Sequence, residues 1–404
     1  MQPARILIHD YPGHAFPAQL ARKLARRSYD VLHLSSRSVL TPRGAVGNPD
    51  SDPPSLRFSE IDLGQVIKKQ AFVRRYFKEK RYGRLLAERI LEFRPEIVIS
   101  ATTPLDAQAA ALDAARKVGA TFIFWLQDIQ GIAIERLLGA RLGVFGRLVG
   151  RHYTAMEQRL LRSSDAVVVI SEDFRGVLRE WNVEDRAIRT IPNWASTDEV
   201  PERPKNNPWS LAHGIATTFC FVCSGTLGMK HDPGLLLQLA RHYRDDKEAC
   251  VVVISEGAAA EWLATKAREL ELDNLLVLPF EPYATLPDVL ASADVLVAIL
   301  EPEAGVFSVP SKVLSYLCAA RPILLAVPQE NLAARTVVEA GAGVVVRPGD
   351  MQALLQEADT LRRDPERRKQ MGARAREYAM KNFDLDRIAD QFEEVFQFAL
   401  QSRR

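Results

Sequence analysis

Short apolar runs alternate with longer segments in which apolar residues recur at helical spacing. In the first half of the chain the runs lie at 6–8, 31–34, 96–100, 121–126 and 165–171. An apolar run bounded by turn residues predicts a buried strand, and the helical segments between the runs predict crossover connections. The pattern therefore predicts an α/β domain with a parallel sheet, whose strand-end loops gather along one edge.

The same alternation restarts after a stretch rich in proline and polar residues at 195–210, which we interpret as a linker. Apolar runs follow at 219–223, 249–254, 275–278, 293–300, 323–327 and 343–346. Residues 40–60 predict a long loop, and residues 384–400 predict an amphipathic helix. A chain of 404 residues exceeds what one hydrophobic core usually supports. We therefore predict two α/β domains, over 1–200 and 201–383.

The composition is that of an ordinary globular protein, with 47% hydrophobic and 26% charged residues. A formal net charge of +2 gives no overall basic field of the kind that attracts nucleic acid, so we expect no nucleic-acid partner.

Four cysteines are too few for a secreted disulfide framework. Cys220 and Cys223 lie three apart on a predicted strand and so point to opposite faces, which favours buried structural thiols over a metal site.

Two segments of the first half are strongly basic. Residues 68–94 interleave lysine and arginine with aromatic side chains, and residues 132–163 interleave arginine with leucine, valine and phenylalanine. Such a face can lie against an anionic membrane surface, but it can equally be a solvated helix face. No apolar run is long enough to span a bilayer, and residues 1–10 indicate a strand rather than a signal peptide. We expect a cytoplasmic protein, with peripheral contact at the inner face of the plasma membrane as an open alternative.

Two strand-end loops of the second half have the chemistry of a phosphate site. They contain Gly225, Gly228 and Lys230 in one loop, and Pro310, Ser311 and Lys312 at the predicted start of a helix. Glycine lets the backbone approach a ligand closely, and the amide groups at a helix start attract anions. Taken alone, Ser311 and Lys312 are as easily an ordinary cap and a solvated lysine. Two cationic loops together suit a diphosphate.

The first half offers three candidates beside predicted strand ends. Gly13 and His14 follow the first strand, and Asp128 follows the run at 121–126. Gly13 would let the backbone approach a ligand and His14 would present a ring, at the end of the sheet where open α/β folds bind ligands. The alternatives are an ordinary turn with a solvated histidine, and an aspartate that caps the next helix.

Six motifs, in this order, resemble glycosyltransferase family 4, a large group of retaining GT-B transferases that use nucleotide-sugar donors. The motifs are DYPGH at 10–14, QD at 127–128, IPNW at 191–194, SGTLGMKH at 224–231, PSK at 310–312 and ARPI at 320–323. Within the family the chain looks most like bacterial surface-polysaccharide transferases of the colanic-acid and O-antigen (L-fucosamine transferase) kind. The resemblance covers nearly the whole chain. It implies two Rossmann-like domains facing across a cleft, with the C-terminal helix crossing back to the N-terminal domain.

By the family pattern the domain over 1–200, completed by 384–404, binds the acceptor, and the domain over 201–383 binds the donor. The implied donor-binding residues are Gly225, Thr226, Gly228, Lys230, Glu256, Gly257, Phe280, Pro310, Ser311, Lys312 and Ser315. The implied acceptor-binding residues are Gly13, His14 and Asp128. For catalysis we assign Lys230 and Lys312 to the departing diphosphate, and Asp128 and His14 to the acceptor hydroxyl.

Three positions depart from the family pattern. The glutamate pair of the broader family is replaced by Phe307 and Ser315, and the arginine of the first donor loop is replaced by Thr226. The resemblance therefore assigns neither the donor sugar nor the catalytic base. No DxD-like carboxylate cluster lies at a predicted strand end, so we expect no metal cofactor.

The sequence predicts transfer of a hexosyl or N-acetylhexosaminyl group from a nucleoside diphosphate, with UDP as the expected carrier. The expected acceptor is a hydroxyl of a polyprenyl-linked or oligosaccharide glycan in surface-polysaccharide synthesis, and the resemblance implies retention of configuration. Two alternatives stay open. A nucleotide-sugar 2-epimerase shares the two-domain architecture but needs no acceptor. A non-catalytic nucleotide-sugar-binding subunit would tolerate the absent glutamate pair, because fold constrains function loosely.

Overall fold

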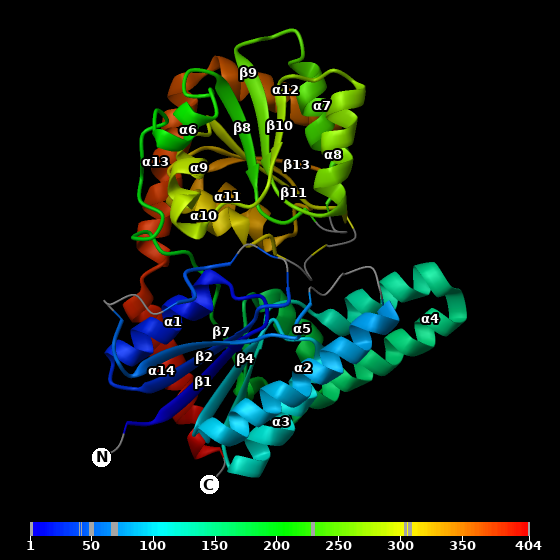
Figure 1. The fold of residues 1–404 in the computed structure, drawn as a ribbon, viewed down its shortest axis with the longest axis vertical. Helices are drawn as coiled ribbons and strands as arrows, with labels where there is room; N and C mark the ends of the chain where they lie inside the picture. Colours follow the sequence, from blue (N-terminus) through cyan, green and yellow to red (C-terminus); the bar gives the residue numbers. More distant parts are fainter. Residues whose placement is uncertain are drawn as a thin grey trace. The chain divides into compact units, whose positions relative to one another are not determined.

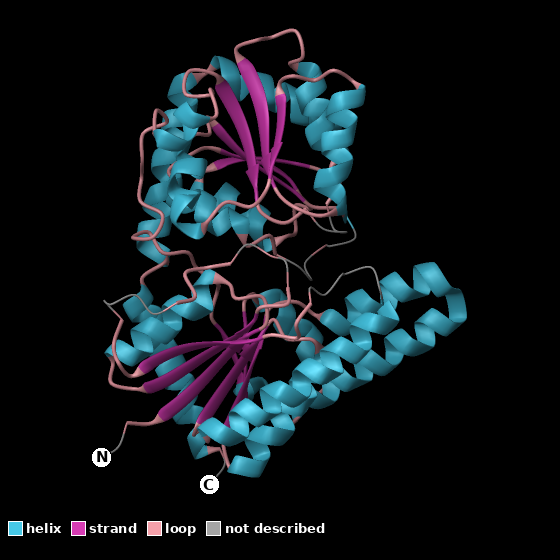
Figure 2. Ribbon diagram, viewed as in Figure 1, coloured by secondary structure: helices cyan, strands magenta, loops and turns pink. Residues whose placement is uncertain are grey.

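The computed structural model describes residues 3–39, 41, 43–47, 52–65, 72–227, 231–302, 305 and 309–402. The chain forms two compact units (Figure 1). Unit 1 comprises residues 1–192 and 385–404, and unit 2 comprises residues 193–384. In each unit the strands form a central sheet that helices cover (Figure 2). This is the α/β architecture that the alternating pattern predicts.

The sheet of unit 1 is parallel, with the strand order β3-β2-β1-β4-β5-β6-β7. Its strands are β1 (Arg5–Asp10), β2 (Asp30–Ser36), β3 (Leu56–Ile61), β4 (Ile97–Ala101), β5 (Thr121–Leu126), β6 (Ala166–Val169) and β7 (Ile188–Thr190). Its helices are α1 (Ala15–Arg26), α2 (Phe72–Phe93), α3 (Leu105–Val118), α4 (Gln130–Arg162), α5 (Glu172–Glu180) and α14 (Leu385–Gln401). The winding direction reverses between β1 and β4. A doubly wound sheet has its ligand crevice at the carboxyl ends of two such strands.

Strand β3 corrects the predicted loop over 40–60. It pairs with β2 at the edge of the sheet, where Val31 lies opposite Leu56 and Ser36 lies opposite Ile61. Only the two terminal residues of β3 are buried, and Arg57 is exposed. An edge strand of this kind lacks the apolar run of a central strand, so hydrophobicity alone does not reveal it.

The sheet of unit 2 is also parallel, with the strand order β10-β9-β8-β11-β12-β13. Its strands are β8 (Phe219–Ser224), β9 (Ala249–Ile254), β10 (Leu275–Leu278), β11 (Val295–Ile299), β12 (Ile323–Ala326) and β13 (Gly343–Val346). Its helices are α6 (Pro208–Ala212), α7 (Gly234–His242), α8 (Ala258–Glu269), α9 (Leu286–Ala291), α10 (Lys312–Cys318), α11 (Leu332–Ala340), α12 (Met351–Arg363) and α13 (Pro365–Asn382). Here the winding reverses between β8 and β11. Both predicted phosphate loops follow these two strands.

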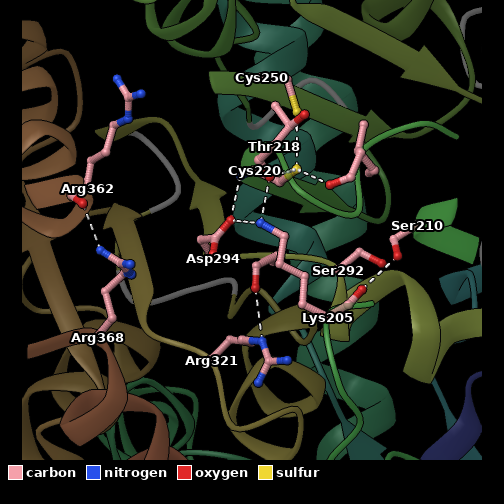
Figure 3. A network of polar contacts seen from close by, with 12 residues as sticks. Lys205, Ser210, Thr218, Cys220, Cys250, Ser292, Asp294, Arg321, Arg362 and Arg368 are labelled. Carbon is pink, nitrogen blue, oxygen red and sulfur yellow. Dashed lines mark hydrogen bonds and ion pairs between the residues drawn. The ribbon is translucent and has the colours of Figure 1, made fainter. Parts of the chain in front are cut away.

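The predicted linker over 195–210 is attached to unit 2 by specific contacts (Figure 3). Lys205 forms an ion pair with Asp294 and donates a hydrogen bond to the carbonyl of Thr218 at 2.6 Å. Arg376 donates to the carbonyls of Thr197 and Val200 at 3.1 and 2.9 Å. Because its backbone and charges are satisfied by unit 2, this stretch is part of that unit rather than a free connection.

Helix α14 lies after unit 2 in sequence but packs in unit 1. Arg27 at the end of α1 binds three acidic side chains of α14, namely Asp386, Asp390 and Glu393. On the apolar side, the buried ring of Phe392 meets Trp125 of β5 edge to face, with ring centres 4.9 Å apart. The predicted amphipathic helix at 384–400 is therefore confirmed, and both of its faces have partners.

Most of the aromatic and apolar face of α2 is buried against its own unit. Tyr82, Leu86, Ile90 and Phe93 are buried, whereas Phe77 is exposed. The basic segment at 68–94 is therefore, over its described part, chiefly a helix that packs on the protein with a solvated charged face. No helix within the described ranges is long and apolar enough to cross a bilayer.

The four cysteines are free thiols and are buried, as predicted. Cys220 lies opposite Cys250 on the neighbouring strand, and the two sulfur atoms are 3.2 Å apart (Figure 3).

Candidate functional site

The side chain of Lys312 lies beside the loop that follows β8. Its Nζ atom donates to the carbonyl oxygen of Thr226 at 3.3 Å. Gly225 has a φ of +123°, and a Cβ atom on it would stand 3.2 Å from Cε of Lys312. The backbone conformation therefore favours glycine, and a Cβ atom at this position would crowd the lysine side chain. The structure brings together these three residues of the predicted donor site.

Tyr316 positions this lysine, although the sequence analysis did not select it. The buried Tyr316 hydroxyl accepts from the Ser224 amide at 3.0 Å, and its single proton faces the carbonyl oxygens of Ser224 and Val297 at 3.1 and 3.2 Å. Ser224 ends β8 and Val297 belongs to β11, so one side chain of α10 ties the helix to both strands at the switch point. The signal available in the sequence was the spacing, because Tyr316 lies one helical turn after Lys312 and therefore on the same face of the helix.

The other residues at the start of α10 have simpler surroundings. Ser311 is the N-cap residue, but its side chain makes no capping hydrogen bond, and the residue is exposed. Pro310 is buried and Ser315 is partly buried. The helix begins where the sequence predicts, and the Ser311 hydroxyl is not used to cap it.

The region predicted to surround the base forms one connected corner of unit 2. The Glu256 carboxylate accepts a hydrogen bond from the amide of Phe280 at 3.2 Å. Gly257 has a φ of +98° and is the N-cap of α8. The amide of Leu227 donates to the Ser255 hydroxyl at 3.1 Å, which joins this corner to the glycine loop. Glu256, Gly257 and Phe280 therefore belong to the same edge of the sheet as Gly225.

Three residues that the sequence analysis named lie outside the described residues. They are Gly228, Lys230 and Phe307. The assignments of Gly228 and Lys230 to the donor diphosphate remain predictions.

In unit 1, the carboxylate of Asp10 holds His14 at the end of β1. One oxygen, Oδ2, accepts the His14 amide at 2.5 Å, and the other, Oδ1, lies 3.2 Å from the ring Nδ1. Asp10 is fully buried, whereas the His14 side chain is 28% exposed. Gly13 has a φ of +78°, which closes the tight turn between the two. The motif at 10–14 contains all three residues, but only Gly13 and His14 were predicted from it as site residues.

The charges around His14 favour its protonated form. Burial, the largest single influence, lowers the pKa of His14, but the charge of Asp10, the hydrogen bond to it and the charge of Asp128 outweigh burial and raise the pKa above its ordinary value. For Asp10, burial acts to raise the pKa, yet the charge and hydrogen bonds of His14 leave it lowered. The structure therefore places Asp128, Asp10 and His14 in one electrostatic group.

A buried network lies beneath this group. His9 faces Tyr82 Oη and Thr103 Oγ1, each at 2.9 Å, through its two ring nitrogens. Burial, only partly opposed by the charge of Asp10, lowers the pKa of His9 to about 3, so the ring is neutral. The network fixes the ends of β1 and β4 and is not itself exposed to a ligand.

Glu157 of α4 is a further buried acid beside Asp128. Its carboxylate accepts the amides of Gln130 and Gly131 at 3.0 and 2.7 Å, which caps the start of α4. Burial raises its pKa to about 7, the two amides oppose the shift, and the charge of Asp128 adds to it. Glu157 therefore caps the start of α4 from the returning part of the same helix.

Across the described ranges, no group of three or more histidine, cysteine or acidic side chains is arranged to hold a metal ion.

Two sequence families match this chain, one in each unit. Residues 12–194 match the family described as glycosyl transferase 4-like domain, and residues 211–378 match glycosyl transferases group 1. The chain belongs to glycosyltransferase family 4. A relative from Pseudomonas aeruginosa, the probable glycosyltransferase WbjE, is 26% identical over 238 residues. The matched stretch spans 59% of this chain and 59% of that relative.

Solved structures share the GT-B fold of the family. Sucrose-phosphate synthase from Thermosynechococcus elongatus superposes with a TM-score of 0.74 at 15% identity, covering 99% of this chain and 100% of that one. Anabaena HepE, solved with UDP-glucose, gives 0.69 at 14% identity, covering 97% and 99%. The lipopolysaccharide glycosyltransferase WaaG gives 0.67 at 15% identity, covering 95% and 98%. At these identities the matches show the fold, and they confirm the predicted pair of Rossmann-like domains.

Proposed function

We propose that this protein transfers a sugar from a nucleoside-diphosphate donor, most simply a UDP-hexose or UDP-N-acetylhexosamine, to a hydroxyl group. The acceptor is a polyprenyl-linked or oligosaccharide glycan in the synthesis of a surface polysaccharide. In the reaction the bond between the sugar C1 and the diphosphate breaks, and the nucleoside diphosphate leaves with the bonding electrons. C1 then bonds to the acceptor oxygen, which loses its proton. Retention of configuration follows the family.

One observation carries the proposal: Lys312 lies against the glycine loop at the switch point of unit 2. Its Nζ atom is within 3.3 Å of the Thr226 carbonyl, and Gly225 leaves room for a ligand's phosphate to approach the backbone. A fixed cation at this edge would stabilise the negative charge that develops on the departing diphosphate. We assign Lys230 to the same task. Lysine side chains, rather than a metal ion, then stabilise the charge on the departing diphosphate.

Unit 2 is then the donor domain and unit 1 the acceptor domain. In unit 1, the partly exposed ring of His14 is held by Asp10 and lies in the field of Asp128. Such a ring can orient an acceptor hydroxyl, and in its neutral form, above its raised pKa, it can also receive the proton of that hydroxyl. We assign the acceptor contacts to Gly13, His14 and Asp128, with Asp10 as the residue that positions His14.

The named relatives support this choice of substrates. HepE was solved with UDP-glucose, and WaaG acts in lipopolysaccharide biosynthesis. A lipid-linked acceptor would also place the protein at the cytoplasmic face of the membrane.

The test is a donor screen followed by a transfer assay. Thermal-shift measurements across nucleoside diphosphates and their sugars identify the donor, and that donor is then incubated, radiolabelled, with and without a lipid extract. Transfer of label to lipid supports the proposal. Isomerisation of the donor without acceptor indicates the 2-epimerase, and donor binding with neither reaction indicates the non-catalytic subunit. Either result overturns sugar transfer.

A further inference from the structure

Helix α4 is a hairpin of two antiparallel arms. Its helical backbone is interrupted at Gly143, where φ is +57° and ψ is −131°. Residues on either side of this reversal lie against each other: a Cβ atom on Gly131 would meet Thr154, and one on Gly150 would meet Glu135. Figure 1 shows the two arms extending away from the sheet of unit 1.

Small residues allow the two arms to pack closely along their length. A Cβ atom on Gly150 would stand 2.3 Å from Cα of Glu135, and one on Gly146 would stand 1.9 Å from the carbonyl oxygen of Leu138. Side chains larger than hydrogen cannot occupy these positions without moving an arm. The arms are therefore a preorganised pair rather than a loose loop.

The base of the hairpin is fixed to unit 1. Glu157 on the returning arm accepts the amides of Gln130 and Gly131 at the start of the outgoing arm. Tyr153 donates to the carboxylate of Asp106 on α3 at 3.0 Å. The hairpin thus projects from a held base.

The tip of the hairpin carries an apolar patch. Leu142, Val144, Phe145 and Leu148 are 56%, 67%, 69% and 58% exposed. They surround the turn at Gly143, so four large apolar side chains gather at the far end of a projecting element. We call these four residues the tip. A patch of this kind marks an interaction site.

The charges around the tip have one sign. Between Glu135 and Glu157 the sequence contains four arginines and no aspartate or glutamate. Arg136, Arg147 and Arg151 are exposed, and Arg151 also lies 3.7 Å from the carboxylate of Glu135, which bounds this stretch. Apolar side chains flanked by arginine are the composition of segments that enter the interface of an anionic bilayer, where the arginines stay at the phosphates.

We propose that the tip inserts into the interfacial region of a bilayer that contains anionic phospholipid. The four apolar side chains enter the acyl boundary, and the surrounding arginines bind the lipid phosphates. The inference rests on the proposed function, in which a lipid-linked acceptor brings the protein to a membrane. The tip is then the segment that attaches the protein to the bilayer, by insertion. These charges favour lipid over a second copy of this chain, because two tips would bring arginine against arginine.

The experiment is flotation of the full chain with phosphatidylcholine vesicles, with or without phosphatidylglycerol. The test variant is V144Q/F145Q/L148Q. The matched control is L211Q/V338Q/M380Q, which removes three apolar side chains of similar exposure from unit 2. We expect the wild type and the control to float with anionic vesicles, and the tip variant to lose at least about tenfold in partition coefficient. Near-ultraviolet circular dichroism and the melting temperature confirm that both variants fold.

A second measurement separates insertion from surface adsorption. The four native cysteines are buried, so V144C and, as control, V338C can be labelled with an environment-sensitive fluorophore. We expect a blue shift and quenching by acyl-brominated lipid for V144C alone. Flotation without that shift overturns tip insertion but leaves peripheral attachment intact. Equal flotation of the tip variant overturns the proposal, as does self-association of the wild type that the tip variant loses. None of these results depends on sugar transfer, which has its own assay.

Discussion

Asp10 contacts His14 with both of its carboxylate oxygens, one on the backbone amide at 2.5 Å and the other near the ring nitrogen at 3.2 Å. The two contacts fix the turn and the ring with a single buried side chain. A histidine held in this way has a defined orientation and a charge state that depends on its partner.

Replacing Asp10 with asparagine should lower the pKa of His14. The pKa is raised in the folded protein, so the stability that protonation of His14 contributes, while Asp10 is ionised, is fully present below the unfolded value of 6.5 and is lost as pH rises through the folded value. Urea unfolding at a series of pH values should show this loss in the wild type and not in D10N or H14N. H152N, which replaces an exposed histidine of the same unit, is the control for loss of a histidine.

Replacing Glu157 with glutamine should remove a different pH dependence. The folded pKa of about 7 lies above the unfolded value of 4.5, so its contribution to stability is present below 4.5 and is lost as pH rises through 7. The free energy of unfolding of E157Q relative to wild type should therefore improve with pH over this window, by an amount on the order of 3 kcal/mol. Denaturant titrations at both ends of the window measure it. The exposed E88Q variant is the reference for loss of a glutamate. If the stability of the wild type and of E157Q changed in parallel with pH, the raised pKa of Glu157 would be contradicted.

Replacing Lys312 with alanine should reduce transfer by about 10²–10³-fold in kcat, because a preorganised cation on the leaving group would be lost. The melting temperature should change little, since the Lys312 ammonium group makes a 3.3 Å contact to the Thr226 carbonyl and a weak one to a thiol. K266A, which removes a surface lysine paired with Glu269, is the control and should be fully active. Wild-type turnover in K312A would refute the donor assignment.

Replacing Gly225 with alanine should weaken donor binding more than it weakens the fold. The new Cβ atom would stand 3.2 Å from Cε of Lys312, and the backbone strain should cost about 1–3 kcal/mol. G214A tests strain alone, because Gly214 also has a positive φ and a Cβ atom added there would meet nothing within 4 Å in the part of the chain that the structure describes. Donor titration by calorimetry should show a loss in G225A only. An equal affinity in the two variants would mean that the loop at Gly225 does not contact the donor.

Replacing Phe392 with alanine should destabilise unit 1 by about 3–5 kcal/mol, because a fully buried ring against Trp125 leaves a cavity. Calorimetry should show the loss. F77A removes an exposed phenylalanine of the same unit and should leave the transition nearly unchanged.

The sequence predicts elements whose burial requires a regular apolar pattern. It predicts less well the elements that depend on an edge position or on local backbone angles. The central strands could be predicted because both of their faces are covered, which requires continuous apolar runs such as that of β5. Strand β3 could not, because an edge position tolerates Arg57 and Glu60. The reversal of α4 depends on the backbone angles of one glycine, Gly143, among several in an otherwise helical pattern.

The candidate site divides in the same way. Motifs at strand ends identified Gly225, Lys312 and His14, because a parallel sheet brings such ends to one edge. The residues that position them were not selected. Both are buried. Tyr316 of α10 contacts Ser224 of β8, which is distant in sequence. Asp10 contacts His14 where the chain turns back after β1. Only the folded structure reveals such contacts.

The place of α14 also has a consequence for biosynthesis. A ribosome makes residues 193–384 as one uninterrupted stretch, so unit 2 holds everything it needs once that stretch has emerged. Unit 1 is complete only after α14 has been translated. Until then Trp125 lacks its Phe392 partner and Arg27 lacks its acidic partners. The incomplete core of unit 1 is then available to chaperones for the whole time that the second half is being made.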